Sequence, residues 1–407
     1  MKIRLSIVVF IAAIVLSLSF TACMGDAPDG MSAETAETTS GSEDQKMLEI
    51  DLEQCGEFLP FTELGFNGVD LVSSCGRQGV LEAGTKTADG LYYAYNMDTG
   101  EIDFMGQSDT GIVSSGVAVF MEDGSYATTD LFRGEDDKLY RTVLAADTNG
   151  FRILESKEIQ PDEFPFIYLH KMSETQFLAT EIDPAESMVK RFDLESNTIT
   201  TLLSFPYNME NGSKKTGKVL RNALVSGNSI YALLLTLDSQ ECYEIEQYDL
   251  DGNYIATLDS SAAKRFFTVT PYNFNCIGNH IILHDVNANC GIYRIDGNNL
   301  TEIISPKQGL QVYLSSIADF YGEEEMRYIF LSNHRENQDN LLFALDLCSS
   351  ELKKAKIKSP DKYLHAFSLD PEGNLILEMK KEPYQIQAEY YYLSAETINR
   401  IFSEISY

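Results

Sequence analysis

Short stretches of alternating apolar and polar residues fill the chain from about residue 69 to its end, and they recur in a fixed order. Alternation with many β-branched and aromatic residues predicts strands. A turn phrase recurs among them, most clearly at Phe192–Asn197, Tyr248–Asn253 and Tyr293–Asn298. Seven copies, counted on the apolar residue before the turn, lie about 45 to 56 residues apart, a spacing typical of copies of one supersecondary unit. Those residues are Met97, Ala146, Leu194, Leu250, Ile295, Leu347 and Leu393.

A second set of turns keeps the same period. Glycine marks six of these turns, and Thr175 takes the equivalent place in the third copy. Glycine and asparagine accept the positive φ that tight hairpins require, so each repeat is expected to hold two tight hairpins and a longer connection between them. The glycines are Gly76, Gly124, Gly227, Gly278, Gly322 and Gly373.

Seven units of four strands without a notable helical stretch predict an all-β fold, a seven-bladed β-propeller of four-stranded antiparallel blades. A degenerate first repeat would leave six blades, and a hidden unit would make eight. The fifth repeat is expected to begin with a strand at 266–270, the sixth with one at 312–317, and the seventh to end with one at 398–405. A leftover strand at 47–52 is expected to join the seventh blade. The lysine-rich strand at 353–358 is interpreted as a protected outer edge.

The first residues predict an export signal. Lys2 and Arg4 precede an apolar run from Leu5 to Phe20, and Cys23 follows small residues. Residues 24–45 are poor in apolar bulk, which predicts a disordered tether. The predicted organisation is a signal peptide over 1–22, a tether over 23–45 and a propeller over 46–407. An ordinary signal peptide with an incidental cysteine, or an uncleaved anchor, is the alternative.

Phe20-Thr21-Ala22-Cys23 resembles the lipobox of bacterial lipoproteins, with Phe20 in place of the usual leucine. With the blade period, the chain resembles bacterial surface lipoproteins whose body is a TolB-like or quinoprotein-like propeller. The resemblance implies a diacylglyceryl group on Cys23 and an extracytoplasmic location on the membrane. Two acyl chains are sufficient for stable attachment to a bilayer.

Charge and cysteine content narrow the functions further. The net charge of −31 disfavours nucleic acid and anionic lipid headgroups as partners. Six cysteines besides Cys23 leave disulfides open in an exported chain, and Cys276 with Cys290 is the favoured pair because both fall in one repeat. The other four are Cys55, Cys75, Cys242 and Cys348.

No catalytic signature stands out, and neither a metal nor a cofactor is expected. The stretch Gly212–Lys218 imitates a phosphate loop but lacks the Ser or Thr that would bind magnesium. Its lysines, Lys214, Lys215 and Lys218, are candidates for contacting a partner. Tyr384, in a long loop, is a further candidate. His280 and His284 lie too far apart on one strand to hold one ion.

The long connections are expected to emerge on one face of the ring, and binding sites favour loops held by a rigid scaffold. The leading hypothesis is therefore a membrane-tethered, monomeric binding or scaffold protein that recognises a protein or glycan through this face. The opposing hypothesis is a cell-surface polysaccharide lyase or hydrolase that uses acidic residues at the channel mouth. A sensor that delivers a small ligand to a transporter is a third possibility.

Overall fold

A computed structural model gives the fold of the compact unit Met47–Tyr407. The described residues are 47–66, 68–84, 91–107, 119–121, 125–133, 138–147, 150–159, 167–183, 185–208, 215–237, 242–264, 271–285, 290–305, 328–332, 340–359, 361–369, 372–382 and 387–403. The predicted signal peptide, the tether and the strand at 312–317 lie outside them.

The described strands form six sheets, numbered here in chain order. Sheet 1 holds β3 (Gly68–Cys75), β4 (Gln78–Gly84), β5 (Leu91–Asn96) and β6 (Ile102–Gln107). Sheet 2 holds β7 (Val119–Phe120), β8 (Tyr126–Arg133), β9 (Leu139–Asp147) and β10 (Gly150–Ile159). Sheet 3 holds β11 (Ile167–Lys171), β12 (Gln176–Ile182), β13 (Glu186–Asp193), β14 (Thr198–Asn208), β15 (Thr216–Ser226), β16 (Ser229–Thr236), β17 (Cys242–Asp249) and β18 (Tyr254–Thr257).

The remaining sheets each have four strands, and two of them recruit a strand from the beginning of the chain. Sheet 4 holds β19 (Pro271–Ile277), β20 (His280–Asp285), β21 (Cys290–Asp296) and β22 (Asn299–Ile304). Sheet 5 holds β23 (Tyr328–Ser332), β24 (Leu341–Asp346), β25 (Glu351–Lys358) and β1 (Leu48–Asp51). Sheet 6 holds β26 (Tyr363–Leu369), β27 (Leu375–Lys380), β28 (Glu389–Leu393) and β2 (Glu57–Leu59). The helical elements are α2 (Leu52–Cys55), α4 (Ala395–Ser403) and the 3₁₀ turns η1 (Phe61–Leu64) and η2 (Ser261–Ala263).

The fold is an all-β propeller, but the prediction of seven separate four-stranded blades is wrong: five of the described sheets have four strands and one has eight. The predicted third and fourth repeats merge because β14 and β15 pair, Tyr207 with Gly217 and Asn208 with Thr216. Gly217 has φ +92°, and a Cβ there would lie 2.3 Å from the Pro206 carbonyl oxygen. Only glycine permits so close a backbone approach.

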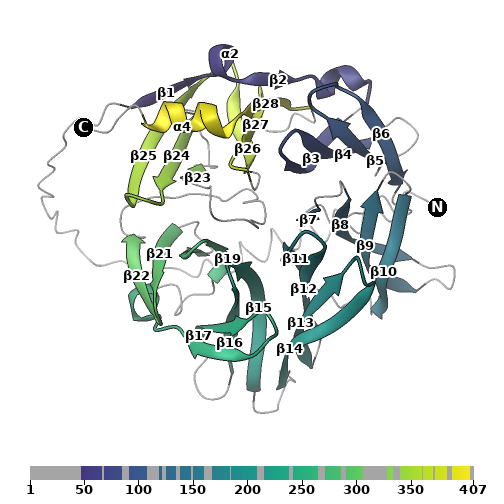
Figure 1. The fold of residues 1–407 in the computed structure, drawn as a ribbon, viewed down its shortest axis with the longest axis vertical. Helices are drawn as coiled ribbons and strands as arrows, with labels where there is room; N and C mark the ends of the chain where they lie inside the picture. Colours follow the sequence, from purple (N-terminus) through teal and green to yellow (C-terminus); the bar gives the residue numbers. More distant parts are fainter. Residues whose placement is uncertain are drawn as a thin grey trace, which may run out of the picture. The chain divides into compact units, whose positions relative to one another are not determined.

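The sheets follow one another around a common centre (Figure 1), and apolar side chains fill the seams between them. At the seam between sheets 2 and 3, Val143 packs with Phe177 and Phe192. One larger cluster runs from Ile292 of sheet 4 through Phe330 of sheet 5 to Leu377 of sheet 6. Face-to-face contact between neighbours therefore holds the ring together, which fits a repeat unable to bury its apolar face alone.

The first strands of the described unit pair with other sheets than predicted. The leftover strand β1 pairs in parallel with β25 in sheet 5, and a second strand, β2, joins sheet 6 antiparallel to β28. The lysine-rich β25 is thus not a free edge, and Lys358 pairs with Glu49 at 2.6 Å. The segment predicted as the last strand of the seventh repeat is helix α4, whose buried Ile398 and Phe402 lie one helical turn apart.

Two smaller expectations concern sheet 4. The strand predicted at 266–270 lies outside the described residues, and the first described strand of sheet 4 is β19, over Pro271–Ile277. Cys276 and Cys290 are free thiols. They lie on β19 and β21, with β20 between them. Two strand spacings separate such positions by roughly 9–10 Å, beyond the reach of a disulfide.

The turn glycines within the described residues have the positive φ that the sequence predicts, whereas Gly124 and Gly322 lie outside them. Gly227 has φ +54° and Gly278 has φ +57°, each in a hairpin between a first and a second strand. In the other set of turns, Asp249 accepts hydrogen bonds from the backbone N–H of Asp251 at 3.0 Å and of Asn253 at 2.8 Å. Its carboxylate therefore closes the turn, as Asx residues commonly do.

Candidate functional site

Each run of four strands has a tight-turn end and a long-loop end. The first-to-second and third-to-fourth turns lie at the tight-turn end, for example between Ser226 and Ser229. The second-to-third connections, such as that from Lys380 to Glu389, and the passages from one run to the next lie at the long-loop end. The long-loop end is the binding face predicted from the sequence.

The predicted site residues are only partly described. Cys23, Lys214 and Tyr384 lie outside the described residues, whereas Lys215 and Lys218 lie at the start of β15, at the long-loop end. Lys215 is exposed. Lys218 is paired with Glu244 at 2.7 Å and Glu246 at 2.5 Å. Partial burial opposes its charge, but the hydrogen bonds to both glutamates raise the pKa of Lys218 overall. Lys218 is thus a neutralised cation within its own sheet.

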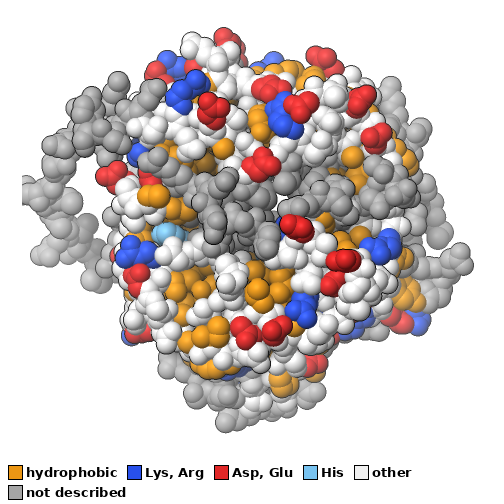
Figure 2. All heavy atoms as spheres, in the orientation of Figure 1, with side chains coloured by type: hydrophobic (Ala, Val, Ile, Leu, Met, Phe, Trp, Pro, Cys, Tyr) orange, Lys and Arg blue, Asp and Glu red, His pale blue; other side chains and the backbone are white. Residues whose placement is uncertain are grey.

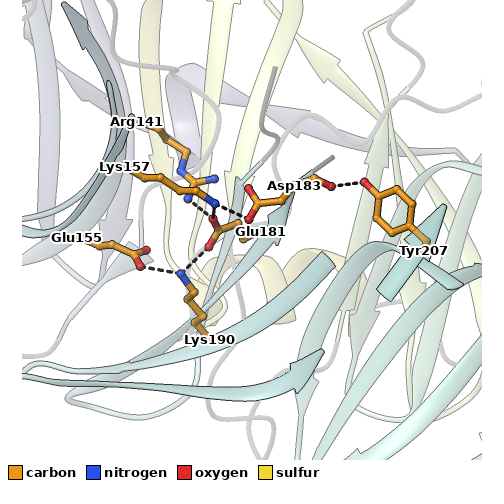
Figure 3. Close-up of polar contacts among 7 residues, drawn as sticks. All are labelled: Arg141, Glu155, Lys157, Glu181, Asp183, Lys190 and Tyr207. Atoms are coloured by element: carbon orange, nitrogen blue, oxygen red, sulfur yellow. Dashed lines mark hydrogen bonds and ion pairs between the residues drawn. The ribbon is translucent and has the colours of Figure 1, made fainter. Parts of the chain in front are cut away.

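A network of six charged side chains spans the seam between sheets 2 and 3 near the long-loop end (Figure 3). Strands of sheet 2 and strands of sheet 3 each contribute to it, and Asp183 also lies beside Tyr207, whose hydroxyl donates to the Asp183 carbonyl oxygen. The six residues are Arg141 of β9, Glu155 and Lys157 of β10, Glu181 of β12, Asp183 after β12, and Lys190 of β13.

Glu181 is the centre of this network. It forms ion pairs with Arg141, with Lys190 at 2.6 Å and with Lys157 at 3.1 Å. The side chains of Arg141 and Glu181 are 3% and 2% exposed. Burial alone would raise the pKa of Glu181, but the nearby charges and hydrogen bonds of Arg141 and Lys190 outweigh it and lower the pKa to about 2. Glu181 is therefore a permanent anion at neutral pH.

The network continues the packing of the seam. Arg141 lies two residues before Val143 on β9, and Glu181 lies two residues after Ala179 on β12, so each shares a strand face with its apolar neighbour. Val143 and Ala179 belong to the apolar cluster of this seam. Three cations face three anions, so the polar end of the seam is neutral. The buried pair Arg141–Glu181 joins the two sheets at this point, and each carboxylate of the network has a cationic partner.

A second group of titratable side chains lies at the seam between sheets 6 and 1. Glu378 pairs with Lys380 at 2.9 Å and lies 3.9 Å from His365. Desolvation, and then the charge of Glu378, raises the pKa of Asp70 on β3, whereas Lys380 and His365 act in the opposite sense. Tyr390 donates to the Val69 carbonyl oxygen at 3.4 Å, beside Asp70. Carboxylates with perturbed pKa values mark candidate functional sites.

Further hydrogen bonds join side chains across seams and within sheets. Asn222 of β15 contacts the His170 Nε2 at 3.1 Å and donates to the Phe274 carbonyl oxygen at 3.3 Å, which links β11, β15 and β19. In sheet 6, Lys362 pairs with Glu389 and donates to the Tyr391 hydroxyl at 3.1 Å. These contacts hold the innermost strands in fixed positions.

None of the seam residues was a candidate from the sequence, and Lys218, which was, pairs within its own sheet. Arg141 and Glu181 are 40 positions apart, and only the fold brings them together. Each interrupts an apolar strand at a position that alternation assigns to the core, and this was the available signal. On the face drawn in Figure 2, charged side chains are scattered around the ring, and some acidic and basic ones lie next to each other.

The described residues were also considered as metal ligands and as membrane-spanning helices. Within the described residues, no three His, Cys, Asp or Glu side chains converge in a way that could hold a metal ion. None of the described helices has the length and apolar character needed to span a bilayer.

Solved structures similar to this chain are propellers. The β-propeller domain of the Trilobed protease from Pyrococcus furiosus, which has an open velcro topology, matches with a TM-score of 0.50 and 13% identity, over 80% of this chain and 94% of that one. An acylaminoacyl peptidase in complex with Z-Gly-Gly-Phe-chloromethyl ketone matches with a TM-score of 0.50 and 14% identity, over 87% of this chain. The chain spans 55% of the length of that peptidase. At such identities the likeness shows the fold alone.

No protein-family model matches the sequence. The comparison with curated proteins gives no match either.

Proposed function

We propose that the chain is an extracytoplasmic lipoprotein, anchored to the bacterial membrane through Cys23, whose propeller binds a protein or glycan partner at the long-loop end. The residues before 47 act as signal peptide and tether in this proposal. The lipobox-like sequence at Phe20–Cys23 supports the anchoring, and the propeller fold supports a rigid scaffold with loops on one face.

The observation that carries the binding role is the mutual neutralisation of charges at the long-loop end. Glu181, Glu246 and Glu389 each have a lysine or arginine partner within the ring. A hydrolase or lyase needs carboxylates that remain free to give or take a proton. Paired carboxylates fix the ends of the strands from which the loops leave, which is what a preorganised binding surface requires.

Affinity purification from the native membrane tests this role. The tagged, lipidated full chain is compared with a variant carrying Lys215→Glu and Lys381→Glu, two exposed lysines at the long-loop end. The matched control is Arg400→Glu, an exposed charge reversal on α4 at the opposite end. We expect the lysine variant to lose recovery of the partner at least tenfold, and the control to retain it. Equal recovery in all three proteins would contradict a binding surface at this end.

Anchoring is tested separately by Cys23→Ala. The wild-type chain is expected in the membrane fraction and to incorporate labelled fatty acid, whereas the variant incorporates none. A wild-type chain that carries no acyl label, or that remains in the medium, would disprove the anchor without affecting the binding role.

The second candidate function is a cell-surface polysaccharide lyase or hydrolase. The group around Asp70 supports it, because a carboxyl with a raised pKa beside Glu378 and His365 resembles the acid of an acid–base pair. Turnover of cell-wall or capsular polysaccharide by the purified chain, abolished by Asp70→Asn, would establish this function. The binding proposal expects no turnover.

A further inference from the structure

The beginning of the chain forms a strap across two neighbouring sheets. The N-terminal strap is defined here as residues 48–61, which hold β1, α2, β2 and the first residue of η1. Its strand β1 pairs with β25 at the outer edge of sheet 5, and β2 pairs with β28 at the outer edge of sheet 6 (Figure 1). One short segment therefore completes both of the last two sheets.

The strap also contributes to the apolar seams. Ile50 and Leu52 are 1% and 2% exposed and belong to the cluster shared by sheets 4, 5 and 6. Phe61 packs against Tyr95 of sheet 1 at 4.9 Å and Tyr390 of sheet 6 at 5.0 Å, measured between ring centroids. The strap thus closes the ring between its last and first sheets.

Charges fix the position of the strap. Glu49 pairs with Lys358 at 2.6 Å on β25, the strand that carries the lysines read as edge protection from the sequence. At the other end of the strap, Arg77 of sheet 1 holds both carboxylate oxygens of Glu57, at 2.7 and 2.8 Å. An acidic strap thus matches a basic edge, and a bidentate arginine holds its far end.

The strap is joined to sheet 1 through the residues that precede β3. Gly65 in this connection has φ +79°, and a Cβ there would meet no heavy atom within 4 Å. All the strand partners of the strap lie in the last two sheets of the chain. Moving the strap to the same two edges of another molecule therefore breaks no strand pairing inside the remaining sheets, and Phe66 of the connection can keep its contact with Tyr93 of sheet 1, at 4.9 Å between ring centroids.

A released strap exposes Ile50, Leu52 and Phe61, and it uncovers the edges of β25 and β28. Unpaired edges and exposed apolar side chains drive association with a matching partner. The partner that matches these edges in strand length, apolar pattern and charge is a strap of the same sequence. We propose that two copies of this chain associate by exchanging their N-terminal straps, each strap pairing with β25 and β28 of the other copy.

One added cysteine on each of two chains, in a background in which the exposed Cys242 and Cys348 are replaced by serine, tests the exchange. Glu49 and Lys356 are register partners in the β1–β25 pair, at a spacing that a disulfide can bridge. Full-length Glu49→Cys and full-length Lys356→Cys chains, carrying different tags, are mixed at high concentration, pulsed with mild denaturant, returned to buffer and oxidised. We expect a disulfide-linked species with both tags and twice the mass of one chain.

Two controls make the result decisive. The double variant Glu49→Cys with Lys356→Cys is expected to form an intrachain disulfide when diluted. Lys264 is exposed and does not pair with the strap. Mixing Glu49→Cys with Lys264→Cys is therefore expected to give no crosslink above background. An intrachain disulfide without any mixed dimer overturns the exchange, and failure of the intrachain disulfide overturns the strap register on which it rests.

Discussion

Arg141 and Glu181 are buried, and each lies two residues from a buried apolar residue of its own strand, Val143 and Ala179 respectively. On folding, both side chains lose their hydrating water and form an ion pair with each other. Glu181 also pairs with Lys157 and Lys190. A buried ion pair of this kind adds little stability compared with apolar residues of similar size. Replacing only one partner is strongly destabilising, because the charge of the other is left buried and uncompensated. The cost of each single replacement is therefore much larger than the worth of the pair.

Replacing either partner alone tests this reasoning. Arg141→Met and Glu181→Gln are each expected to lower the free energy of unfolding by about 3–5 kcal/mol, measured by urea denaturation. The double variant Arg141→Met with Glu181→Met should recover a large part of that loss. Lys138→Ala is the control, because its pair with Glu158 is half exposed and worth at most about 1 kcal/mol. Additive losses in the double variant would contradict coupling.

The acid limb of the stability curve depends on the same glutamate. The pKa of Glu181 is about 2 in the folded chain, against 4.5 for an unperturbed glutamate. The folded state thus binds this proton less readily than the unfolded state, so its contribution is complete above pH 4.5 and declines as pH falls towards 2. Stability measured from pH 6 to pH 2 should fall less steeply in Glu181→Gln than in the wild type. Parallel curves would show that Glu181 titrates normally.

Thiol reactivity separates the cysteines by burial. Cys290 is fully buried, and desolvation raises its pKa far above that of a free thiol. Cys242 and Cys348 are exposed. With iodoacetamide at pH 8, mass spectrometry should find Cys242 and Cys348 alkylated in the native protein and Cys290 alkylated only after denaturation. Protection of Cys290 that persists after denaturation without reductant would indicate a disulfide.

At the scale of elements, the strands were predictable where turn residues and alternation agreed. The phrase around Asp249 and the hairpin at Gly278 each lie where the sequence places them. Helix α4 was missed because its apolar residues were assigned to a strand, although Ile398 and Phe402 have helical spacing and Ser394 accepts the Thr397 N–H as an N-cap. The merging of two repeats at β14 and β15 depends on a contact at Gly217 that no periodicity reveals.

Helix α4 is expected to stabilise sheet 5 through the aromatic side chain of Phe402. Phe402 is fully buried, with ring centroids 5.4 Å from Tyr328 and 5.7 Å from Phe330. Phe402→Ala should lower the free energy of unfolding by about 3–5 kcal/mol, as for other fully buried phenylalanines. Ser403→Ala, next to it and exposed, is the control and should change stability by less than about 0.5 kcal/mol. Similar losses in both variants would show that the helix does not pack as described.

At the scale of the whole molecule, the net charge of −31 opposes compactness, whereas the seam ion pairs favour it. Salt weakens both effects, but it screens exposed charges far more than half-buried pairs. The long-range repulsion is therefore the part that salt removes. The positions of the charges that pair across seams could not be predicted, because pairs such as Lys190 with Glu155 join different sheets.

Melting temperature should consequently rise with ionic strength. Between about 20 mM and 500 mM NaCl the Debye length falls from roughly 20 Å to about 4 Å, so most surface repulsion disappears. Calorimetry or circular dichroism should show an increase of a few degrees. A fall over this range would mean that the ion pairs, and not the net charge, dominate the electrostatics of folding.

The N-terminal strap has a consequence for biosynthesis. Residues 48–61 are synthesised before the strands of the other sheets, yet β25 and β28, with which they pair, are among the last strands to be made. Pairing between such distant segments slows folding and leaves edges unprotected in the meantime. A nascent or partly translocated chain thus carries an unfinished ring until almost its final residue. A chain that stops before residue 389 lacks β28, so β2 would have no strand to pair with.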